Sequence, residues 1–246
     1  MLLVRHGRTS ANTAGILAGR SPGVELDDVG RQQAATLGDR MAPVPLAALV
    51  SSPLRRCRQT AQALLGPRTD AVPSTTDTGL IECGYGDWTG RTLKELSKEK
   101  LWTTVQQQPS AVRFPGGEAM TEMAARAVGA IRGWDAKVTG EHGDQAVWVA
   151  VSHGDVIKAI LADALGTHLD TFQRILVNPA SVSVVRYTAA RPYVVTMNST
   201  GSDLAALFPP PAPGATKPAG RGRRSRATSD DAPVGGGLGA HEAPPR

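Results

Sequence analysis

The sequence predicts an α/β fold, a three-layer α/β/α sandwich with a mostly parallel central sheet. Short apolar runs alternate with longer segments of helical periodicity, and this alternation favours parallel strands joined by helical crossovers. The run at 146–151 is apolar at every position, which is typical of a strand covered on both faces. Aromatic residues make up only 4% of the chain, so we expect a core built mostly from Ala, Val, Leu and Ile.

The first 45 residues predict a strand, a loop and a helix. Leu2 to Val4 is the strand, and it runs directly into polar residues. Small residues and turn formers at 15–23 predict the loop. The helix follows with an aspartate, at 27 or 28, as its N-cap, and the prolines at 43 and 45 end it. Its expected apolar stripe consists of Ala34, Ala35, Leu37 and Met41.

The next segment repeats this order of strand and helix. Residues 46–50 form a compact apolar run that predicts the second strand. We expect the following helix to be capped by Ser52, to carry Pro53 in its first turn and to end at Gly66. The second strand therefore also ends next to arginine side chains.

Glycines interrupt residues 79–90 and predict an irregular segment that holds Glu82 by loop geometry. Thr92 to Glu95 forms a capping box, which predicts a helix that runs to about Trp102. A second glycine turn at 114–118 leads into a long amphipathic helix. The apolar stripe of that helix consists of Met123, Ala127, Ile131 and Trp134.

The C-terminal part predicts the end of the domain. A helix is expected over 156–165, after the central strand. Two further apolar or alternating runs, at 181–187 and 193–197, predict a closing hairpin or edge pair. We therefore expect one domain over residues 1–202, followed by a disordered Pro/Gly/Arg-rich tail at 203–246.

The net charge of +5 raises the question of a nucleic-acid partner. Much of the basicity lies in the tail, in Arg221, Arg223, Arg224 and Arg226. No aromatic residues on which bases could stack are interleaved with these arginines, so we expect no nucleic-acid partner; a basic nucleic-acid arm is the alternative. No apolar run approaches the roughly 20 residues of a membrane span, and the N-terminus lacks a secretory signal pattern. We therefore expect a cytoplasmic protein with no membrane partner.

The chain has two cysteines, Cys57 and Cys83. Because the sequence shows no secretory signal, we expect reduced thiols rather than a disulfide. The two cysteines also lack the spacing of metal ligands. We expect no metal site and no cofactor.

Polar side chains follow three of the predicted strands. They are Arg5 and His6 after the first strand, arginines at 55–56 after the second, and His153 after the central one, while Glu82 lies on the glycine-rich segment. Because the carboxyl ends of parallel strands meet at one edge of a sheet, we expect these side chains to converge. Arginines and histidines around one point predict a pocket for a dianion. A carboxylate there would repel phosphate, so its expected use is to protonate a leaving oxygen and then to activate water.

The same motifs, in this order, resemble the histidine phosphatase superfamily, which includes cofactor-dependent phosphoglycerate mutases and many phosphomonoesterases. Arg-His-Gly at 5–7 is similar to the family's nucleophile loop. Residues 52–61 resemble its Ser-Pro-Leu-x-Arg-Ala-x-Gln-Thr-Ala motif, with a cysteine at 57 in place of alanine. Residues 80–90 resemble the acid-bearing segment, and Pro-Gly-Gly-Glu at 115–118 and Ser-His-Gly at 152–154 complete the set. The resemblance covers roughly residues 1 to 200.

The resemblance implies a phosphoglycerate mutase-like fold and a role for each matched residue. His6 would attack phosphorus and form a phosphohistidine, and Glu82 would act as the acid and then as the base. The implied phosphate ligands are Arg5, Arg56 rather than Arg55, His153 beside the phosphate, Asn12 and Gly154. For Asn12, the alternative is that it only braces the loop. No metal is implied.

We expect a metal-independent phosphomonoester hydrolase, a histidine acid-type phosphatase, that acts on a small phosphorylated metabolite. Residues 85–90 resemble the phosphatase branch, and residues 83–113 lack the adjacent arginine pair associated with phosphoglycerate mutases. A phosphomutase is one alternative, and a phosphate-ligand binding protein with little turnover is another. A homodimer is among the assemblies left open. His142 and His168 match no motif, so we expect both on the surface.

Overall fold

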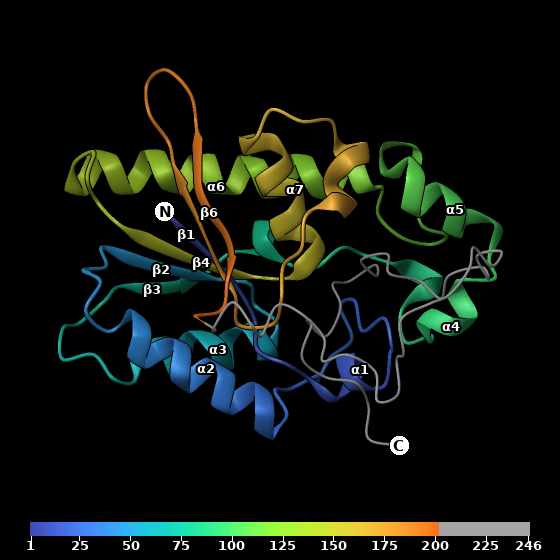
Figure 1. Ribbon diagram of the computed structural model, residues 1–246, viewed down its shortest axis with the longest axis horizontal. Helices are drawn as coiled ribbons and strands as arrows, with labels where there is room; N and C mark the ends of the chain where they lie inside the picture. Colours follow the sequence, from blue (N-terminus) through green and yellow to red (C-terminus); the bar gives the residue numbers. More distant parts are fainter. Residues whose placement is uncertain (202–246) are drawn as a thin grey trace, which may run out of the picture.

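A six-stranded sheet in the order β3-β2-β4-β1-β5-β6 organises residues 1–201, the part of the chain that this computed structural model describes. Figure 1 shows the sheet between two layers of helices. The strands are β1 (Leu2–Arg5), β2 (Ala48–Ser51), β3 (Ser74–Thr76), β4 (Trp148–Ser152), β5 (Val182–Arg186) and β6 (Tyr193–Ser199). The first four run parallel to one another, and β5 and β6 form an antiparallel hairpin at one edge, with β5 antiparallel to β1. The predicted mostly parallel sheet and closing hairpin are confirmed, whereas the tail predicted at 203–246 lies outside the described residues.

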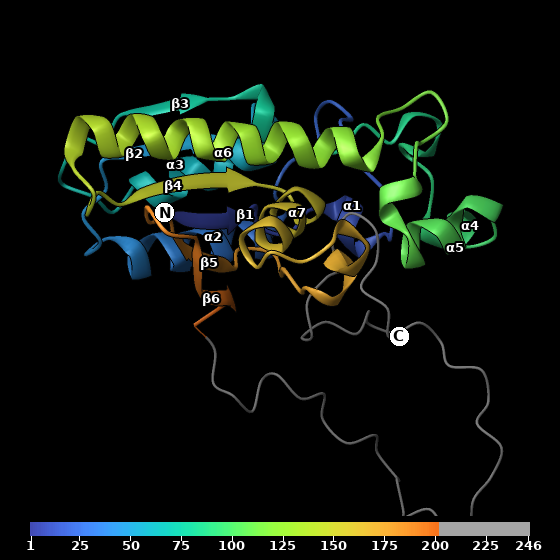
Figure 2. The ribbon, with the colours of Figure 1, turned by 90° about the horizontal axis from the view of Figure 1, so that it is seen from above.

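The helices that flank the sheet form the two outer layers. Below it in Figure 1 lie α2 (Asp28–Met41) and α3 (Arg55–Leu65), and above it lie α6 (Met120–His142) and α7 (Gly154–Ala164). Seen from above, α6 lies along the sheet (Figure 2). The shorter elements are α1 (Ser10–Thr13), η1 (Thr78–Leu80), η2 (Gly86–Trp88), α4 (Leu93–Leu96), α5 (Lys100–Gln107), η3 (Pro109–Ala111) and η4 (Leu169–Arg174). No helix within residues 1–201 is long and apolar enough to cross a membrane.

Strand β4 is apolar from Trp148 to Val151 because helices cover both faces of the sheet there. Val149 and Val151 pack into the core under α2 and α3, and Trp148 and Ala150 pack into the larger core under α6 and α7. Successive side chains of a strand point to opposite faces, so a strand covered on both sides needs an apolar residue at every position. All five residues of β4 are buried, which places the central strand where the sequence predicts it.

The predicted aspartate cap of helix α2 is Asp27, whose side chain accepts a hydrogen bond from the Gly30 amide at 2.7 Å. One member of its predicted stripe is wrong: Ala35 is exposed. The buried face is completed instead by Gly30 and Gly38. These glycines allow close backbone approach, since a Cβ on Gly30 would lie 1.9 Å from the carbonyl oxygen of Arg8.

Gly30→Ala is expected to lower the free energy of unfolding by about 1–3 kcal/mol, because the new methyl group overlaps the Arg8 carbonyl. Gly129→Ala is the matched control: it lies on the exposed side of α6, where an added Cβ meets nothing within 4 Å. The control should raise stability by about 0.5–1 kcal/mol. Urea unfolding midpoints measure both, and an unchanged midpoint for Gly30→Ala would contradict this packing.

The start of α3 differs from the prediction. The helix begins at Arg55 with Leu54 as N-cap, so neither Ser52 as the cap nor Pro53 in the first turn is correct. Ser52 still belongs to the sheet ladder, because its amide donates to the carbonyl of Val151 at 2.8 Å. Its hydroxyl lies 2.8 Å from His153 Nε2 and accepts a longer hydrogen bond, of 3.4 Å, from the amide of Leu54. The predicted end at Gly66 is confirmed, since Gly66 is the C-cap.

The segment between β2 and α6 is more broken than predicted. β3 carries the exposed sequence Ser-Thr-Thr, which gives no apolar signal, and it was not predicted. The capping box at Thr92 and Glu95 is confirmed, but the helix ends at Leu96, and a separate helix, α5, begins at Lys100. The Ser97 hydroxyl donates to the carbonyl of Lys94 at 2.9 Å, a local bond that competes with helix continuation.

Candidate active site

The carboxyl ends of β1, β2 and β4 meet at one edge of the sheet. Arg5 lies opposite Ser152 in the ladder between β1 and β4, and Ser51 lies opposite Val151 in the ladder between β2 and β4. The residues that follow these ends therefore share one region, as the sequence predicts. Five predicted site residues lie there with at most 3% of their surface exposed: Arg5, His6, Arg56, Glu82 and His153.

His6 presents one ring nitrogen to this buried group. Its Nδ1 lies 2.7 Å from the carbonyl oxygen of Gly7, which only accepts hydrogen bonds, so Nδ1 carries the proton. Nε2 is then unprotonated, and it accepts a hydrogen bond from Arg56 Nε at 3.3 Å. Burial, followed by the positive charges of Arg56 and Arg5, lowers the pKa of His6 well below its ordinary value. A neutral imidazole with a fixed tautomer is the form that can act as a nucleophile.

The Arg56 side chain reaches from the first turn of α3 to both histidines. Its Nη2 donates to the carbonyl of Gly19 at 2.8 Å and lies 3.2 Å from His153 Nδ1. Its Nη1 is buried and has no hydrogen-bond partner among the described residues. A buried guanidinium donor without a partner is costly, and an anionic oxygen is its best acceptor.

Arg5 adds a second buried guanidinium at the end of β1. Its Nη1 donates to the carbonyl of Val177 at 2.7 Å. Burial lowers the pKa of Arg5 to about 10, and the charges of Glu82 and Asp155 oppose that fall. Arg5 therefore stays cationic at neutral pH, which suits the binding of a dianion.

His153 lies edge-on to His6, with 5.3 Å between the ring centroids. Arg56 can only donate, so His153 Nδ1 is the acceptor of that contact and Nε2 carries the proton. Nε2 lies 2.8 Å from Ser52 Oγ, which fixes the orientation of the ring. Burial, followed by the charge of Arg56, lowers the pKa of His153 well below its ordinary value. A bound phosphate dianion would favour the protonated ring that the sequence analysis expects beside phosphate.

Glu82 is the buried carboxyl of the group. Its Oε1 accepts from the Cys83 amide at 2.9 Å, and its Oε2 lies 3.9 Å from His153 Nδ1. Burial and the negative charge of Asp155 raise the pKa of Glu82 to about 7, although Arg56 and Arg5 oppose the rise. A carboxyl group that titrates near neutrality can both donate and accept a proton.

Three residues that the sequence analysis gave no role hold the Glu82 backbone. The carbonyl of Glu82 accepts from Arg20 Nε at 2.8 Å and from Arg126 Nη2 at 3.1 Å. The Glu118 carboxylate bonds to both arginines and accepts from the Gly84 amide at 3.1 Å. Only the glycine turn before Glu118 signals this arrangement in the sequence, because Arg20 and Glu118 are 98 residues apart.

Asn12 and Gly154 are the two other predicted site residues. Asn12 Oδ1 accepts from the hydroxyl and the amide of Thr9, at 2.9 and 3.0 Å, in the capping box of α1. These bonds brace the loop after His6 and join Asn12 to none of the five buried residues. Gly154 is buried at the first position of α7, directly after His153.

The two cysteines and two further histidines lie as follows. Cys57 and Cys83 are buried free thiols, and Cys57 Sγ lies 3.5 Å from His153 Nε2. Within residues 1–201, no group of three or more His, Cys, Asp or Glu side chains could hold a metal ion. His142 and His168 are both exposed.

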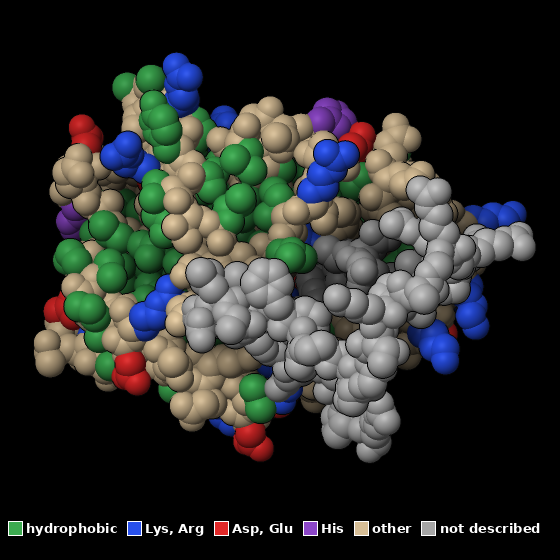
Figure 3. All heavy atoms as spheres, viewed as in Figure 1, with side chains coloured by type: hydrophobic (Ala, Val, Ile, Leu, Met, Phe, Trp, Pro, Cys, Tyr) green, Lys and Arg blue, Asp and Glu red, His purple; other side chains and the backbone are tan. Residues whose placement is uncertain are grey.

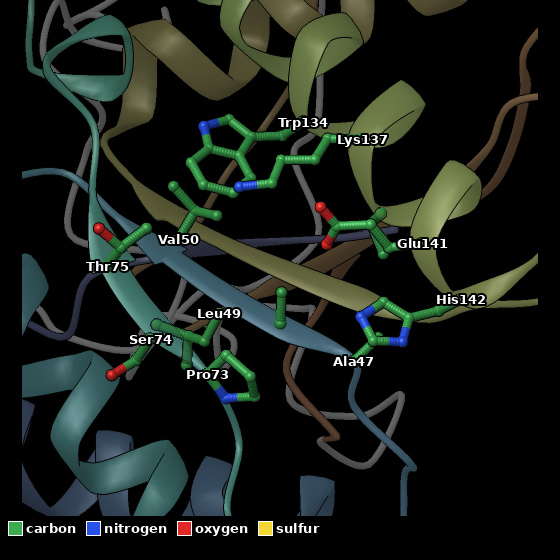
Figure 4. A pocket seen from close by; sticks show the side chains of 12 residues that line it. Ala47, Leu49, Val50, Pro73, Ser74, Thr75, Trp134, Lys137, Glu141 and His142 are labelled. Carbon is green, nitrogen blue, oxygen red and sulfur yellow. The ribbon is translucent and has the colours of Figure 1, made fainter.

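A hollow lies between α6 and the strands β2 and β3 (Figure 4). It has a volume of about 270 Å³ and is lined by side chains that include Val50, Thr75, Trp134 and Lys137. None of the predicted site residues lines it.

The chain matches a family model described as the histidine phosphatase superfamily (branch 1) over residues 1–200. It is 32% identical over 175 residues to a glucosyl-3-phosphoglycerate phosphatase from Mycolicibacterium vanbaalenii, which covers 70% of this chain and 76% of that protein. It is also 32% identical over 209 residues to a bifunctional protein from Mycobacterium tuberculosis, which covers 82% of this chain and 54% of that protein. The chain thus spans about half the length of the first curated relatives that it matches.

Solved structures share the fold. The YhfR protein of Bacillus stearothermophilus superposes with a TM-score of 0.71 at 28% identity and covers 79% of this chain and 94% of that chain. A mycobacterial glucosyl-3-phosphoglycerate phosphatase superposes with a TM-score of 0.71 at 24% identity, covering 81% of this chain and 98% of its own. The α/β fold is that of phosphoglycerate mutase-like phosphatases.

Proposed function

Since this chain belongs to the histidine phosphatase superfamily (branch 1), we propose that it hydrolyses phosphomonoesters of small metabolites through a phosphohistidine on His6. The observation that carries the proposal is the His6 side chain: its Nδ1 is held by the Gly7 carbonyl, and its Nε2 meets the buried Arg56. Curated relatives with phosphatase names support hydrolysis over the other reactions of the family.

In the proposed first step, His6 Nε2 attacks phosphorus while the bond to the leaving oxygen breaks, and Glu82 gives its proton to that oxygen. In the second step, the Glu82 carboxylate takes a proton from water, whose oxygen attacks phosphorus. The bond from phosphorus to Nε2 then breaks, and inorganic phosphate leaves with His6 neutral again. Over the two steps Glu82 loses and regains one proton, and the bond between His6 Nε2 and phosphorus forms and then breaks.

The fixed cations of the site take the charge of the phosphoryl group in this proposal. Arg5 and Arg56 would bind its oxygens, and Arg56 Nη1 is the buried donor available for one of them. His153, Asn12 and Gly154 are proposed as further phosphate ligands. We propose that hydrolysis needs no metal, and we expect the rate to be unchanged after treatment with EDTA.

A substrate panel tests the reaction class. It contains p-nitrophenyl phosphate, phosphoserine, glucosyl-3-phosphoglycerate and 3-phosphoglycerate, the last with and without 2,3-bisphosphoglycerate. Phosphoserine and glucosyl-3-phosphoglycerate are included because relatives carry the names of their phosphatases. Release of phosphate supports a hydrolase. Isomerisation without phosphate release would identify a phosphomutase, and no turnover on the whole panel would favour a phosphate-binding protein.

The proposed acid predicts a pH dependence. Because the pKa of Glu82 is raised to about 7, its carboxyl keeps its proton up to neutral pH and loses it as the pH rises further. For an alkyl phosphate such as phosphoserine, kcat/KM should therefore fall above about pH 7. Glu82→Gln should remove this fall, the alkaline limb of the pH profile, and should lower kcat/KM about 10²–10⁴-fold.

A leaving group that needs no proton provides the control. The p-nitrophenolate ion is a good leaving group, so Glu82→Gln should reduce kcat/KM for p-nitrophenyl phosphate far less than for phosphoserine. Equal losses on the two substrates would show that Glu82 is not the acid.

Three further predictions concern the whole chain. We propose that the phosphatase domain ends near residue 202 and that the protein acts in the cytoplasm without nucleic-acid or membrane partners. We propose a homodimer as the assembly. The edge strand β6 exposes Tyr193, Val195 and Met197, and Figure 3 shows apolar side chains along this hairpin. If the β6 strands of two copies paired antiparallel about a two-fold axis at Val195, the exposed apolar residues of one copy would contact those of the other.

A further inference from the structure

A network of polar side chains, formed by Tyr85, Asp155, Lys158 and Gln173, takes no part in the steps above. The Tyr85 hydroxyl donates to Asp155 Oδ2 at 2.7 Å. The Lys158 ammonium lies 3.8 Å from Asp155 Oδ1 and donates to Gln173 Oε1 at 3.0 Å. Tyr85, Asp155 and Lys158 each have at most 1% of their surface exposed.

The hydrogen bond between Tyr85 and Asp155 joins the two parts of the candidate site. Tyr85 follows Glu82 by three residues on the same irregular loop, and its ring packs edge-on against Phe114 at 5.0 Å. Asp155 is the second residue after His153, in the first turn of α7. The bond therefore fixes the loop that carries the proposed acid to the helix that begins at the second histidine.

Packing alone does not account for the two buried charges of this network, the Asp155 carboxylate and the Lys158 ammonium. The neighbouring buried positions of α7, such as Val156, Ile157 and Ile160, are filled by apolar side chains. A buried carboxylate and ammonium lose their hydration, and apolar residues of similar volume often serve stability as well or better. The buried ammonium of Lys158 is stabilised by the Asp155 carboxylate, by the Gln173 side-chain oxygen and by the Phe172 ring, whose centre lies 5.5 Å away.

We propose that Asp155 and Lys158 are positioning residues for the acid–base steps of Glu82, an inference that rests on the proposed function. Asp155 holds the Glu82 loop through Tyr85, and its negative charge favours the protonated form of Glu82. Lys158 offsets part of that charge, so that Glu82 can still release its proton near neutral pH. The pair sets the protonation of the acid without touching the substrate.

The charges around Glu82 are consistent with this division of roles. Its side chain is influenced by Arg5 from β1, Arg56 from α3, His153 at the end of β4, and Asp155 and Lys158 from α7, together with Cys83 and Tyr85 of its own loop. Arg20 and Arg126 contact its backbone carbonyl. Among the neighbouring charges, Asp155 has the largest effect on the pKa of Glu82, and it raises that pKa. Both Asp155 and Lys158 are buried, so solvent screens their charges only weakly.

The test compares pH profiles of kcat/KM for phosphoserine, or for the best alkyl phosphate of the panel, in the full chain. Asp155→Asn keeps an oxygen for the Tyr85 hydroxyl but removes the charge, and it should move the alkaline limb down by about one pH unit. Lys158→Met removes the offsetting charge and should move the limb up, by less than Asp155→Asn moves it down. Tyr85→Phe cuts the bond but keeps both charges, and it should lower kcat with little movement of the limb.

Opposite shifts are the decisive result, because a purely structural role would lower activity in both variants without moving the limb. Asp163→Asn is the matched control: Asp163 lies on the same helix but pairs with Arg132 at the surface, so its profile should stay at the wild-type position. If either single variant fails to fold, the charge-neutral double variant of Asp155→Asn with Lys158→Met should fold and return the limb toward wild type. Unmoved limbs in folded variants overturn the inference.

A second readout separates this inference from the proposed function. The Glu82 carboxyl carbon can be titrated by ¹³C NMR in wild type and Asp155→Asn, with Glu82→Gln used to assign its signal. A lower midpoint in Asp155→Asn supports the inference even if no phosphatase activity is found on the panel, in which case the proposed function alone fails. The same midpoint in both proteins overturns the inference even if the wild type is an active phosphatase.

Discussion

His6→Ala is expected to abolish phosphate release, with kcat/KM reduced about 10⁴-fold or more for every substrate of the panel. The reason is that Nε2 of His6 is the proposed site of the covalent bond to phosphorus, and this nitrogen is unprotonated and lies 3.3 Å from Arg56 Nε. Steady-state release of phosphate measures the loss.

The control for this variant is His168→Ala, since His168 is exposed and far from any matched motif. It should keep wild-type activity. Thermal unfolding of both variants shows whether the buried site tolerates the change, and His6→Asn, which keeps a polar side chain, serves if the alanine variant unfolds. Activity within tenfold of wild type in a folded His6 variant would rule out His6 as the nucleophile.

Arg56→Ala is expected to have the next largest effect, a fall in kcat/KM of about 10³–10⁵-fold, as found when an arginine that stabilises a transferring phosphoryl group is removed. Arg56 bonds to His6, contacts His153 and keeps Nη1 as a buried donor for an oxygen of the substrate. Arg56→Lys should recover only a small part of the loss, because an ammonium cannot reproduce the planar fork of the guanidinium.

The neighbouring residue is a demanding control for this prediction. Arg55 is exposed and pairs with Glu25 at 2.9 Å, so Arg55→Ala should change kcat/KM by no more than a few fold. The two arginines are neighbours in the sequence, but Arg56 is buried and Arg55 is exposed. A larger loss from Arg55→Ala than from Arg56→Ala would contradict the assignment of the phosphate ligand.

The convergence of the site was predictable because it follows from strand ends. Arg5 directly follows the apolar run at 2–4, and His153 follows the apolar run at 146–151 after one serine; parallel strands bring such positions to one edge of the sheet. Asp27 as the cap of α2 and the box at Thr92 were predictable for a similar reason, since both involve residues within one helical turn.

The failures have physical causes that a local pattern does not carry. Ser52 has the residue type of a helix cap, but the sheet ladder continues through its amide, and its hydroxyl meets His153 from 101 residues away. The exposed strand β3 has no apolar alternation to detect. Arg20 and Arg126 reach Glu82 across 62 and 44 residues. Contacts of this range depend on the assembled fold, so the sequence alone gave them no role.

The central claim is that a phosphoryl group becomes bonded to Nε2 of His6 during turnover. Glu82→Gln is the variant in which this intermediate should accumulate, because p-nitrophenyl phosphate can transfer its phosphoryl group without the acid while water then lacks its base. After an alkaline quench, peptide mass spectrometry should find a phosphoryl group on His6, in an amount equal to the burst of p-nitrophenol. A phosphoryl group on another side chain, or turnover with no covalent adduct, would contradict the account.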